Sequence, residues 1–137
     1  MAALPVKARR EFRVASIAEP ISHYTDAVAF GDLVFVSGCV GSDVTGRILE
    51  PDDVVAQARQ ALQNVGDILA AAGTGFENVL KVTVLLTDVA DRAAVNTVRK
   101  EFFGSARPAS TLIGVAALAL PDAKVEIEAV ACLPPTD

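Results

Sequence analysis

Cysteine, histidine and basic residues are scarce in this 137-residue sequence, and their scarcity excludes several classes of protein. The chain has two cysteines and one histidine. Cys39 and Cys132 have no neighbouring Cys or His at the spacing of metal ligands, and two cysteines without an export signal do not make a disulfide framework. We therefore expect two free thiols and no metal site.

Basic residues are outnumbered by acidic ones. Lys and Arg total 12 against 17 Asp and Glu, which gives a formal net charge of −5. Nucleic-acid affinity rests largely on clustered Lys and Arg, so we expect no nucleic-acid partner. Basic residues cluster only at Lys7, Arg9, Arg10 and Arg13. A short charged arm of this kind is most often solvated, and we assign it no function.

Long apolar runs are also missing. The run at 115–120 is far shorter than the roughly 20 residues that span a bilayer, so we expect no membrane partner. Residues 1–13 lack the continuous apolar segment of a secretory signal, which favours a cytoplasmic location. The composition, 52% hydrophobic and 21% charged, excludes disorder, and the length suits one domain.

Hydrophobic periodicity predicts alternating strands and helices. Between residues 54 and 72 the apolar positions recur every three or four residues, and Gly73 stands where a helix-ending glycine is expected, after an acidic start at Glu50-Pro51-Asp52. A second helical pattern begins near Asp91 and stops before Gly104. The predicted strands cover 27–30, 33–36, 79–86, 111–115 and 124–133.

These elements predict an α/β (α+β) fold: one mixed sheet with two helices packed on one face. We expect residues 1–20 to form an N-terminal arm with a first strand, and 21–137 to form a single domain. Several strands are apolar on both sides, and a monomer would then expose a larger apolar patch than soluble monomers tolerate. The sequence therefore predicts an oligomer.

Short motifs follow one another in a fixed order along these elements. They are Ser22-His23-Tyr24-Thr25-Asp26, Gly31-Asp32-Leu33-Val34-Phe35-Val36-Ser37-Gly38, Gln57-Ala58-Arg59-Gln60, Leu86-Thr87-Asp88, Val95-Asn96, Glu101-Phe102-Phe103, Arg107-Pro108-Ala109 and Val125-Glu126-Ile127-Glu128-Ala129. Together they resemble the Rid (YjgF-type) family over about residues 21–132.

The resemblance implies a chorismate-mutase-like homotrimer with a central barrel and three clefts between subunits. Typical members hydrolyse small reactive enamines and imines, such as 2-aminoacrylate, to a 2-keto acid and ammonia. No metal and no organic cofactor takes part in that reaction. The expected partner is therefore a small-molecule substrate.

One family feature is missing. Typical members carry an arginine two residues after the proline of a Pro-Ala-Arg-Ser stretch, where it binds the substrate carboxylate. Here the stretch is Pro108-Ala109-Ser110-Thr111, so Ser110 stands in the arginine's place. A serine cannot replace a permanently charged fork that holds a carboxylate with two hydrogen bonds. Arg107 could reach over, or it could be an exposed charge before a turn.

Three residues are candidates for the chemistry. Glu126 resembles the family's water-activating carboxylate, and it shares a strand face with Glu128, which we interpret as structural. Tyr24 matches the family tyrosine that lines the cleft, although an ordinary interface aromatic fits too. His23 is the only histidine and suits acid-base work near neutral pH, although a lone histidine often has no such role.

The remaining candidates are expected to contact substrate. Asn96 matches a family asparagine near the cleft, or is a helix-surface amide. Ser110 and Thr111 should line the cleft floor. Cys39 follows Ser37-Gly38, and a small buried hydrophobe is a simpler interpretation of it than a reactive thiol.

Three functions are compatible with these residues. The first is a Rid-like hydrolase for a small enamine, imine or aminomuconate-type metabolite that acts poorly on 2-aminoacrylate. The second is a non-catalytic small-molecule-binding or regulatory trimer. The third, a ribonuclease, follows an old label of the family, and the acidic composition weighs against it.

Overall fold

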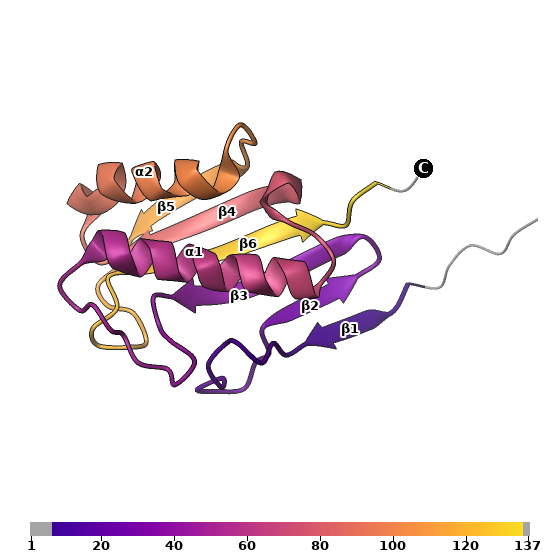
Figure 1. Ribbon diagram of the computed structural model, residues 1–137, viewed down its shortest axis with the longest axis horizontal. Helices are drawn as coiled ribbons and strands as arrows, with labels where there is room; N and C mark the ends of the chain where they lie inside the picture. Colours follow the sequence, from indigo (N-terminus) through magenta and orange to yellow (C-terminus); the bar gives the residue numbers. More distant parts are fainter. Residues whose placement is uncertain (1–6, 136–137) are drawn as a thin grey trace, which may run out of the picture.

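The computed structural model describes residues 7–135, which form one six-stranded sheet with two helices over it (Figure 1). The strands lie in the order β1-β2-β3-β6-β4-β5. Their bounds are β1 Arg9–Phe12, β2 Ala27–Phe30, β3 Leu33–Val40, β4 Val79–Leu86, β5 Ala109–Gly114 and β6 Val125–Cys132. The helices are α1 Val54–Ala71 and α2 Arg92–Phe103, with single 3₁₀ turns at η1 Phe76–Asn78 and η2 Val89–Asp91.

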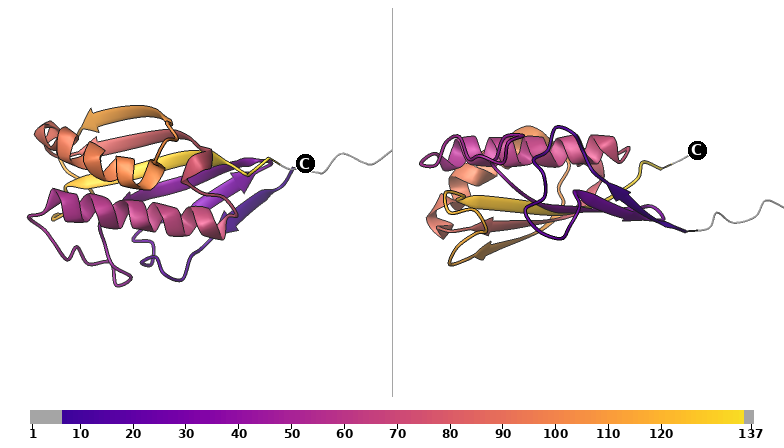
Figure 2. Two further views of the ribbon diagram at one scale, coloured as in Figure 1. Left: turned by 45° about the horizontal axis from the view of Figure 1, so that its top comes forward. Right: turned by 90° about the horizontal axis from the view of Figure 1, so that it is seen from below.

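The sheet is mixed, as the sequence predicted. Strands β4 and β5 pair in parallel, whereas the other neighbouring strands pair antiparallel. Both helices lie on the same face of the sheet, which Figure 2 shows from the side. The predicted architecture, one sheet with two helices on one face, is therefore confirmed.

The ends of α1 differ slightly from the prediction. The acidic residues at 50–52 precede the helix, and Asp53 is its N-cap, with a carboxylate that accepts a hydrogen bond from the Ala56 amide at 3.0 Å. Gly73 follows the helix with φ +90°, where glycine avoids the strain that a Cβ would add. None of the helices within residues 7–135 is long and apolar enough to cross a membrane.

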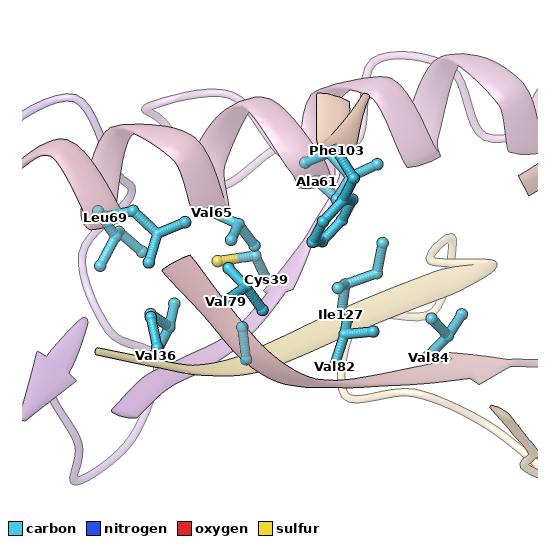
Figure 3. Packing of buried hydrophobic residues seen from close by; sticks show 14 of the residues in the cluster. Val36, Cys39, Ala61, Val65, Leu69, Val79, Val82, Val84, Phe103 and Ile127 are labelled. Carbon is cyan, nitrogen blue, oxygen red and sulfur yellow. The ribbon is translucent and has the colours of Figure 1, made fainter. Parts of the chain in front are cut away.

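The hydrophobic core lies between the helices and the sheet (Figure 3). Val65 and Leu69 of α1 face Val36 and Cys39 of β3, and Ile127 of β6 lies beside them. Buried and partly exposed residues alternate strictly along β6, so Val125, Ile127, Ala129 and Ala131 face the helices. Burial of these side chains holds α1 and α2 on one face.

A buried glutamine fixes α1 to the loop before β6. The Gln57 side chain donates to the carbonyls of Glu50 at 2.8 Å and Asp122 at 3.1 Å, and its Oε1 accepts from the Lys124 amide at 2.8 Å. Gly41 packs directly against Gln57, since a Cβ at Gly41 would lie 2.6 Å from the Gln57 Cα. These contacts position the start of β6, which carries Glu126.

The face of the sheet away from the helices carries exposed apolar side chains. Phe35 of β3 is 49% exposed and lies between Val28 of β2 and Val130 of β6. Ile113 of β5 is 44% exposed beside Leu85 of β4. No element within residues 7–135 covers this face. The apolar face that led us to predict an oligomer is therefore present, and coverage by another copy stays a prediction.

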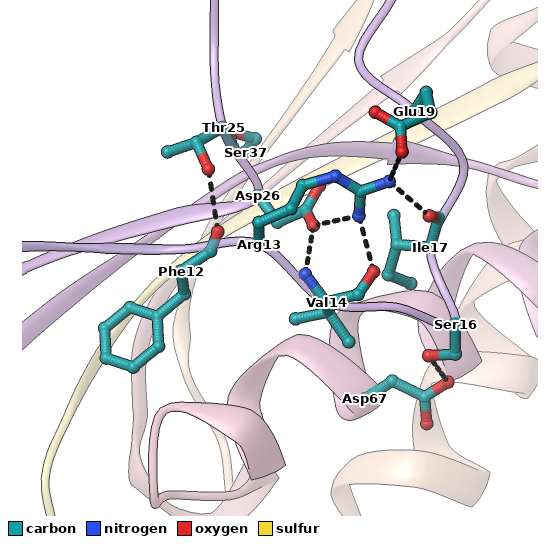
Figure 4. Close-up of polar contacts among 10 residues, drawn as sticks. All are labelled: Phe12, Arg13, Val14, Ser16, Ile17, Glu19, Thr25, Asp26, Ser37 and Asp67. Carbon is teal, nitrogen blue, oxygen red and sulfur yellow. Dashed lines mark hydrogen bonds and ion pairs between the residues drawn. The ribbon is translucent and has the colours of Figure 1, made fainter.

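The N-terminal arm is not simply solvated, which corrects the sequence interpretation. Strand β1 pairs with β2, and the guanidinium of Arg13 donates to the carboxylate of Asp26 at 2.8 Å (Figure 4). Asp26 is buried and also accepts from the Val14 amide at 2.7 Å. A buried carboxylate needs such partners, and the arm supplies them. Arg13 therefore has a structural role.

Candidate functional site

A pocket opens beside the end of β3, and we call it the Tyr24 pocket. It is lined by side chains from the arm, β3, α1 and the loop before β6, among them Ile21, Tyr24, Gly38, Cys39, Asn64 and Leu120. Tyr24 is 46% exposed at this pocket. At its inner side the Asn64 amide donates to the carbonyls of Val40 and Ser42 at 3.1 and 3.0 Å. The pocket is thus largely preformed.

The segment that carries Tyr24 is tied to the strands on either side. The Ser37 hydroxyl donates to the carbonyl of Thr25 at 2.6 Å, and the Thr25 hydroxyl donates to the carbonyl of Phe12 at 2.8 Å. The Ser37 amide donates to the carbonyl of Asp26 at 2.9 Å. These bonds, several of whose residues appear in Figure 4, hold Tyr24 next to Gly38.

Glu126 lies against the backbone of Gly38, on the sheet face away from the helices. A Cβ at Gly38 would lie 2.6 Å from Oε1 of Glu126, so only glycine leaves room for this carboxylate. The register of β3 shifts between Val36 and Cys39, and this irregularity brings Gly38 over the Glu126 side chain. Burial raises the pKa of Glu126, and the neighbouring charge of Glu128 raises it further.

A half-buried carboxylate with a raised pKa is suited to accept a proton from water. Its raised pKa makes it a stronger base than an exposed carboxylate, as required of a general base. The sequence expectation that Glu126 and Glu128 share one face is confirmed by their register opposite Leu85 and Thr83 of β4. Glu128 is exposed, whereas Glu126 is partly buried.

Two other candidates are placed less favourably for chemistry. Cys39 is buried in the core, and burial raises the pKa of its thiol to about 12, so the reactive thiolate is disfavoured. Its thiol donates to the Ser37 carbonyl at 3.5 Å. The interpretation of Cys39 as a small buried hydrophobe is confirmed. His23 is exposed and is not among the residues that line the Tyr24 pocket.

Two adjoining pockets lie between α2 and β5, and we call them together the β5 groove. Both are lined by Asn96, Arg99 and Ser110, and one of them also by Arg107 and Pro108. The Arg99 guanidinium donates to the Ser110 hydroxyl through Nη2 at 3.0 Å. The structure thus brings together Asn96, Arg107 and Ser110, each of which the sequence analysis considered individually as a substrate-contacting residue.

Ser110 and Thr111 do not form one floor, contrary to expectation. Ser110 is opposite the buried Val82, so it faces the helices and Arg99. Thr111 is opposite Thr83 and accepts a hydrogen bond from Lys81 Nζ at 2.6 Å on the other face. Neighbouring strand residues point to opposite faces of a sheet, which explains the separation.

Arg99 was missed at the sequence level. It lies four residues after the buried Val95, so it is on the inward side of α2, and this spacing was the available signal. An arginine at such a position needs partners that only the folded structure shows. Its hydrogen bond to Ser110 makes it part of the β5 groove.

Glu126 does not line the Tyr24 pocket in one chain, although Gly38, against which it packs, does, and Glu126 is also separate from the β5 groove. Glu126 faces away from the helices, whereas Ser110 faces them, and β6 and β5 are separated by β4. One copy therefore does not bring the carboxylate and the groove together.

Comparison with known proteins assigns the chain to a protein family. The family described as endoribonuclease L-PSP matches residues 15–133. The chain belongs to this family, the Rid or YjgF-type family.

Relatives of this Rid protein are similar over nearly their whole length. The 2-iminobutanoate/2-iminopropanoate deaminase of Capra hircus is 45% identical over 123 residues, which cover 90% of this chain and 89% of that protein. The Homo sapiens protein of the same name is 42% identical over 123 residues, with the same coverage of 90% and 89%. The solved structure of TdcF from E. coli with bound serine has a TM-score of 0.83 and 36% identity, covering 91% of this chain and 99% of that chain.

Proposed function

We propose that this Rid protein is a hydrolytic deaminase that converts a small imine or enamine to the corresponding carbonyl compound and ammonia. The observation that carries the proposal is the Glu126 carboxylate, half buried against Gly38 with a raised pKa. Relatives at 42% and 45% identity are named imine deaminases, which supports the same reaction class.

The chemistry requires a base, water and an electrophilic carbon. Glu126 accepts a proton from water while the water oxygen adds to the imine carbon, and the electrons of the C=N bond move to nitrogen, which gains a proton. The C–N bond of the resulting carbinolamine then breaks as the carbonyl forms, and ammonia leaves. The balance is one imine and one water to one carbonyl compound and one ammonia.

Tyr24 is proposed to orient substrate or water. It lies at the pocket that Gly38 also lines, and its segment is held by the hydrogen bonds of Thr25 and Ser37. His23, beside Tyr24 in the chain, is proposed to reach the same place only when a second copy packs there, since it does not line the pocket in one chain.

The site is proposed to be completed by a second copy in a homotrimer. The support is that Glu126 and Ser110 face opposite sides of one sheet, and that an apolar face including Phe35 and Ile113 is left uncovered. When another copy covers that face, the β5 groove of one subunit meets the Glu126 of the next. The substrate then binds in a cleft between them.

Activity on 2-aminoacrylate is proposed to be low compared with that of a relative that carries arginine at the place of Ser110. The carboxylate supplies most of the binding energy of so small a substrate. Removing one partner of a buried charge pair costs about 2–5 kcal/mol, or roughly 30- to several-thousand-fold in kcat/KM. Arg107 is exposed and leaves that loss largely uncompensated.

The assay generates the imine in place with a pyridoxal-phosphate lyase and follows the release of 2-keto acid. With 2-iminobutanoate, the wild-type protein should accelerate release, and Glu126→Gln should not. With 2-aminoacrylate, an arginine-bearing relative should exceed the wild-type protein by at least about 30-fold. Equal rates for the two proteins would contradict the role given to Ser110. No acceleration with either imine would contradict the proposed reaction and favour a binding protein.

A further inference from the structure

The guanidinium of Arg99 is only partly exposed and lacks an anionic partner. Its Nε is the one buried side-chain polar atom in residues 7–135 that has no hydrogen-bond partner. The ion pairs of the described residues do not include Arg99. Burial lowers the pKa of Arg99, yet an arginine stays protonated in proteins. Within residues 7–135, the Arg99 guanidinium is therefore a partly buried positive charge that no acidic side chain neutralises.

The charged residues that line the β5 groove around Arg99 are all basic. The residues that line the β5 groove include Arg92, Lys100 and Arg107 besides Arg99, and no Asp or Glu is among them. The whole chain has a net charge of −5, so this collection of cations runs against the general charge of the molecule. Cations that share a concave region without acids attract small anions.

A hydrogen bond joins the Arg99 side chain to β5. Nη2 donates to the Ser110 hydroxyl at 3.0 Å, which holds the guanidinium between α2 and β5. Asn96, one helical turn before Arg99, lines the same groove and offers a neutral amide beside the charge. A carboxylate there would find charged and neutral donors together.

We propose that Arg99 binds the carboxylate of the ligand in the β5 groove, as the cation that serves in place of an arginine at position 110. This proposal rests on the proposed function in one respect: the ligand is taken to be a small 2-keto or 2-imino acid. One Nη of Arg99 is already engaged by Ser110, so this anchor is weaker than a free fork. That weakness agrees with low activity on 2-aminoacrylate.

The direct test compares two probes that differ only in charge. Binding of 2-oxobutanoate and of its uncharged amide, 2-oxobutanamide, is measured by ligand-observed NMR titration for the full-length wild-type protein. The wild-type protein should prefer the carboxylate by about 10- to 100-fold, the usual worth of a hydrogen bond to a charged group. In Arg99→Gln this preference should fall to a few-fold at most.

Three further variants make the test specific. Arg10→Gln removes an exposed arginine from β1, at the other edge of the sheet, and should keep the preference. Arg99→Lys keeps the charge without the planar fork and should keep part of the preference. Arg107→Gln decides the competing assignment, because loss of the preference in this variant but not in Arg99→Gln would overturn the proposal. Thermal unfolding of each variant establishes that the fold is retained.

The outcomes separate this inference from the proposed function. If wild-type protein shows the charge preference and Arg99→Gln loses it, the inference stands even when no imine is hydrolysed. If the imine is hydrolysed and Arg99→Gln matches the wild-type protein in KM and in carboxylate preference, the function stands and the inference is overturned. If Arg99→Gln unfolds, Arg99→Lys decides: it should keep only part of the carboxylate preference, and a preference and KM that both match the wild-type protein overturn the assignment of the Arg99 guanidinium as the anchor.

Discussion

Replacement of Glu126 by glutamine should separate activity from stability. Glutamine keeps the shape of the side chain against Gly38, where the carboxylate leaves no room for a Cβ. It cannot accept a proton from water. Loss of a general base lowers turnover by about 10²- to 10⁴-fold, so we expect kcat on an imine to fall by at least about 100-fold.

The same substitution should not lower the free energy of unfolding. The direction of this effect follows from the raised pKa of Glu126. Burial and Glu128 raise that pKa in the folded state. The folded protein thus holds the proton more tightly than the unfolded chain, and folding becomes less favourable as pH rises through the two pKa values. Above both, the ionised carboxylate is a standing cost that Glu126→Gln removes. The variant should unfold no earlier than the wild-type protein at neutral pH.

Glu128→Gln is the matched control, because it removes the charge that helps to raise the pKa of Glu126 and leaves Glu126 in place. Carboxylates two residues apart on a strand share a face, and the charge of Glu128 contributes to the raised pKa of Glu126. Glu128→Gln should therefore keep most of the activity and move the acidic limb of the kcat/KM profile to lower pH.

The assay is imine hydrolysis across pH, with thermal unfolding of the same preparations. A fully active Glu126→Gln would show that another group is the base. A Glu126→Gln protein that is inactive but also clearly less stable at neutral pH would refute the reasoning about its pKa, since the loss would then be structural.

Three other predictions concern assembly, packing and reactivity. Light scattering should give a mass near three times 14.2 kDa, and a monodisperse monomer at micromolar concentration would remove the shared cleft. Gly41→Ala should lower the free energy of unfolding by about 1–3 kcal/mol, because its Cβ would lie 2.6 Å from the Gln57 Cα, and an unchanged unfolding midpoint would contradict this close packing. Cys39, with a pKa of about 12, should resist iodoacetamide near neutral pH until the protein unfolds, whereas the partly exposed Cys132 should react first; peptide mass mapping distinguishes them.

Local patterns were enough to predict most of the fold. The spacing of apolar residues in 54–72 located α1, and Gly73 marked its end, because these signals come from the helix itself. The apolar pattern also placed the start of α1 at residue 54, but Glu50-Pro51-Asp52 was assigned to its first turn, whereas these residues precede the helix and Asp53 is the N-cap. The family resemblance was also recognisable from ordered motifs, and the match over residues 15–133 confirms it.

The site was predicted only in part because its contacts are distant in sequence. Arg13 was assigned to a solvated arm, yet its partner Asp26 is 13 residues away and buried. The bond between Arg99 and Ser110 likewise depends on how α2 packs on β5. The alternation of strand faces, by contrast, was available from the sequence and should have separated Ser110 from Thr111. Glu126 and Tyr24 remain predictions as functional residues.

The central claim is that imine hydrolysis occurs in a cleft that two copies build together. It is tested most directly by co-expressing two tagged variants, Glu126→Gln and Ser110→Trp, which remove the base and block the β5 groove respectively. Each variant alone should be inactive on 2-iminobutanoate. Purified mixed oligomers should regain activity, because some clefts join an intact Glu126 from one copy to an intact groove from the next. Mixed oligomers no more active than either variant alone would contradict the claim.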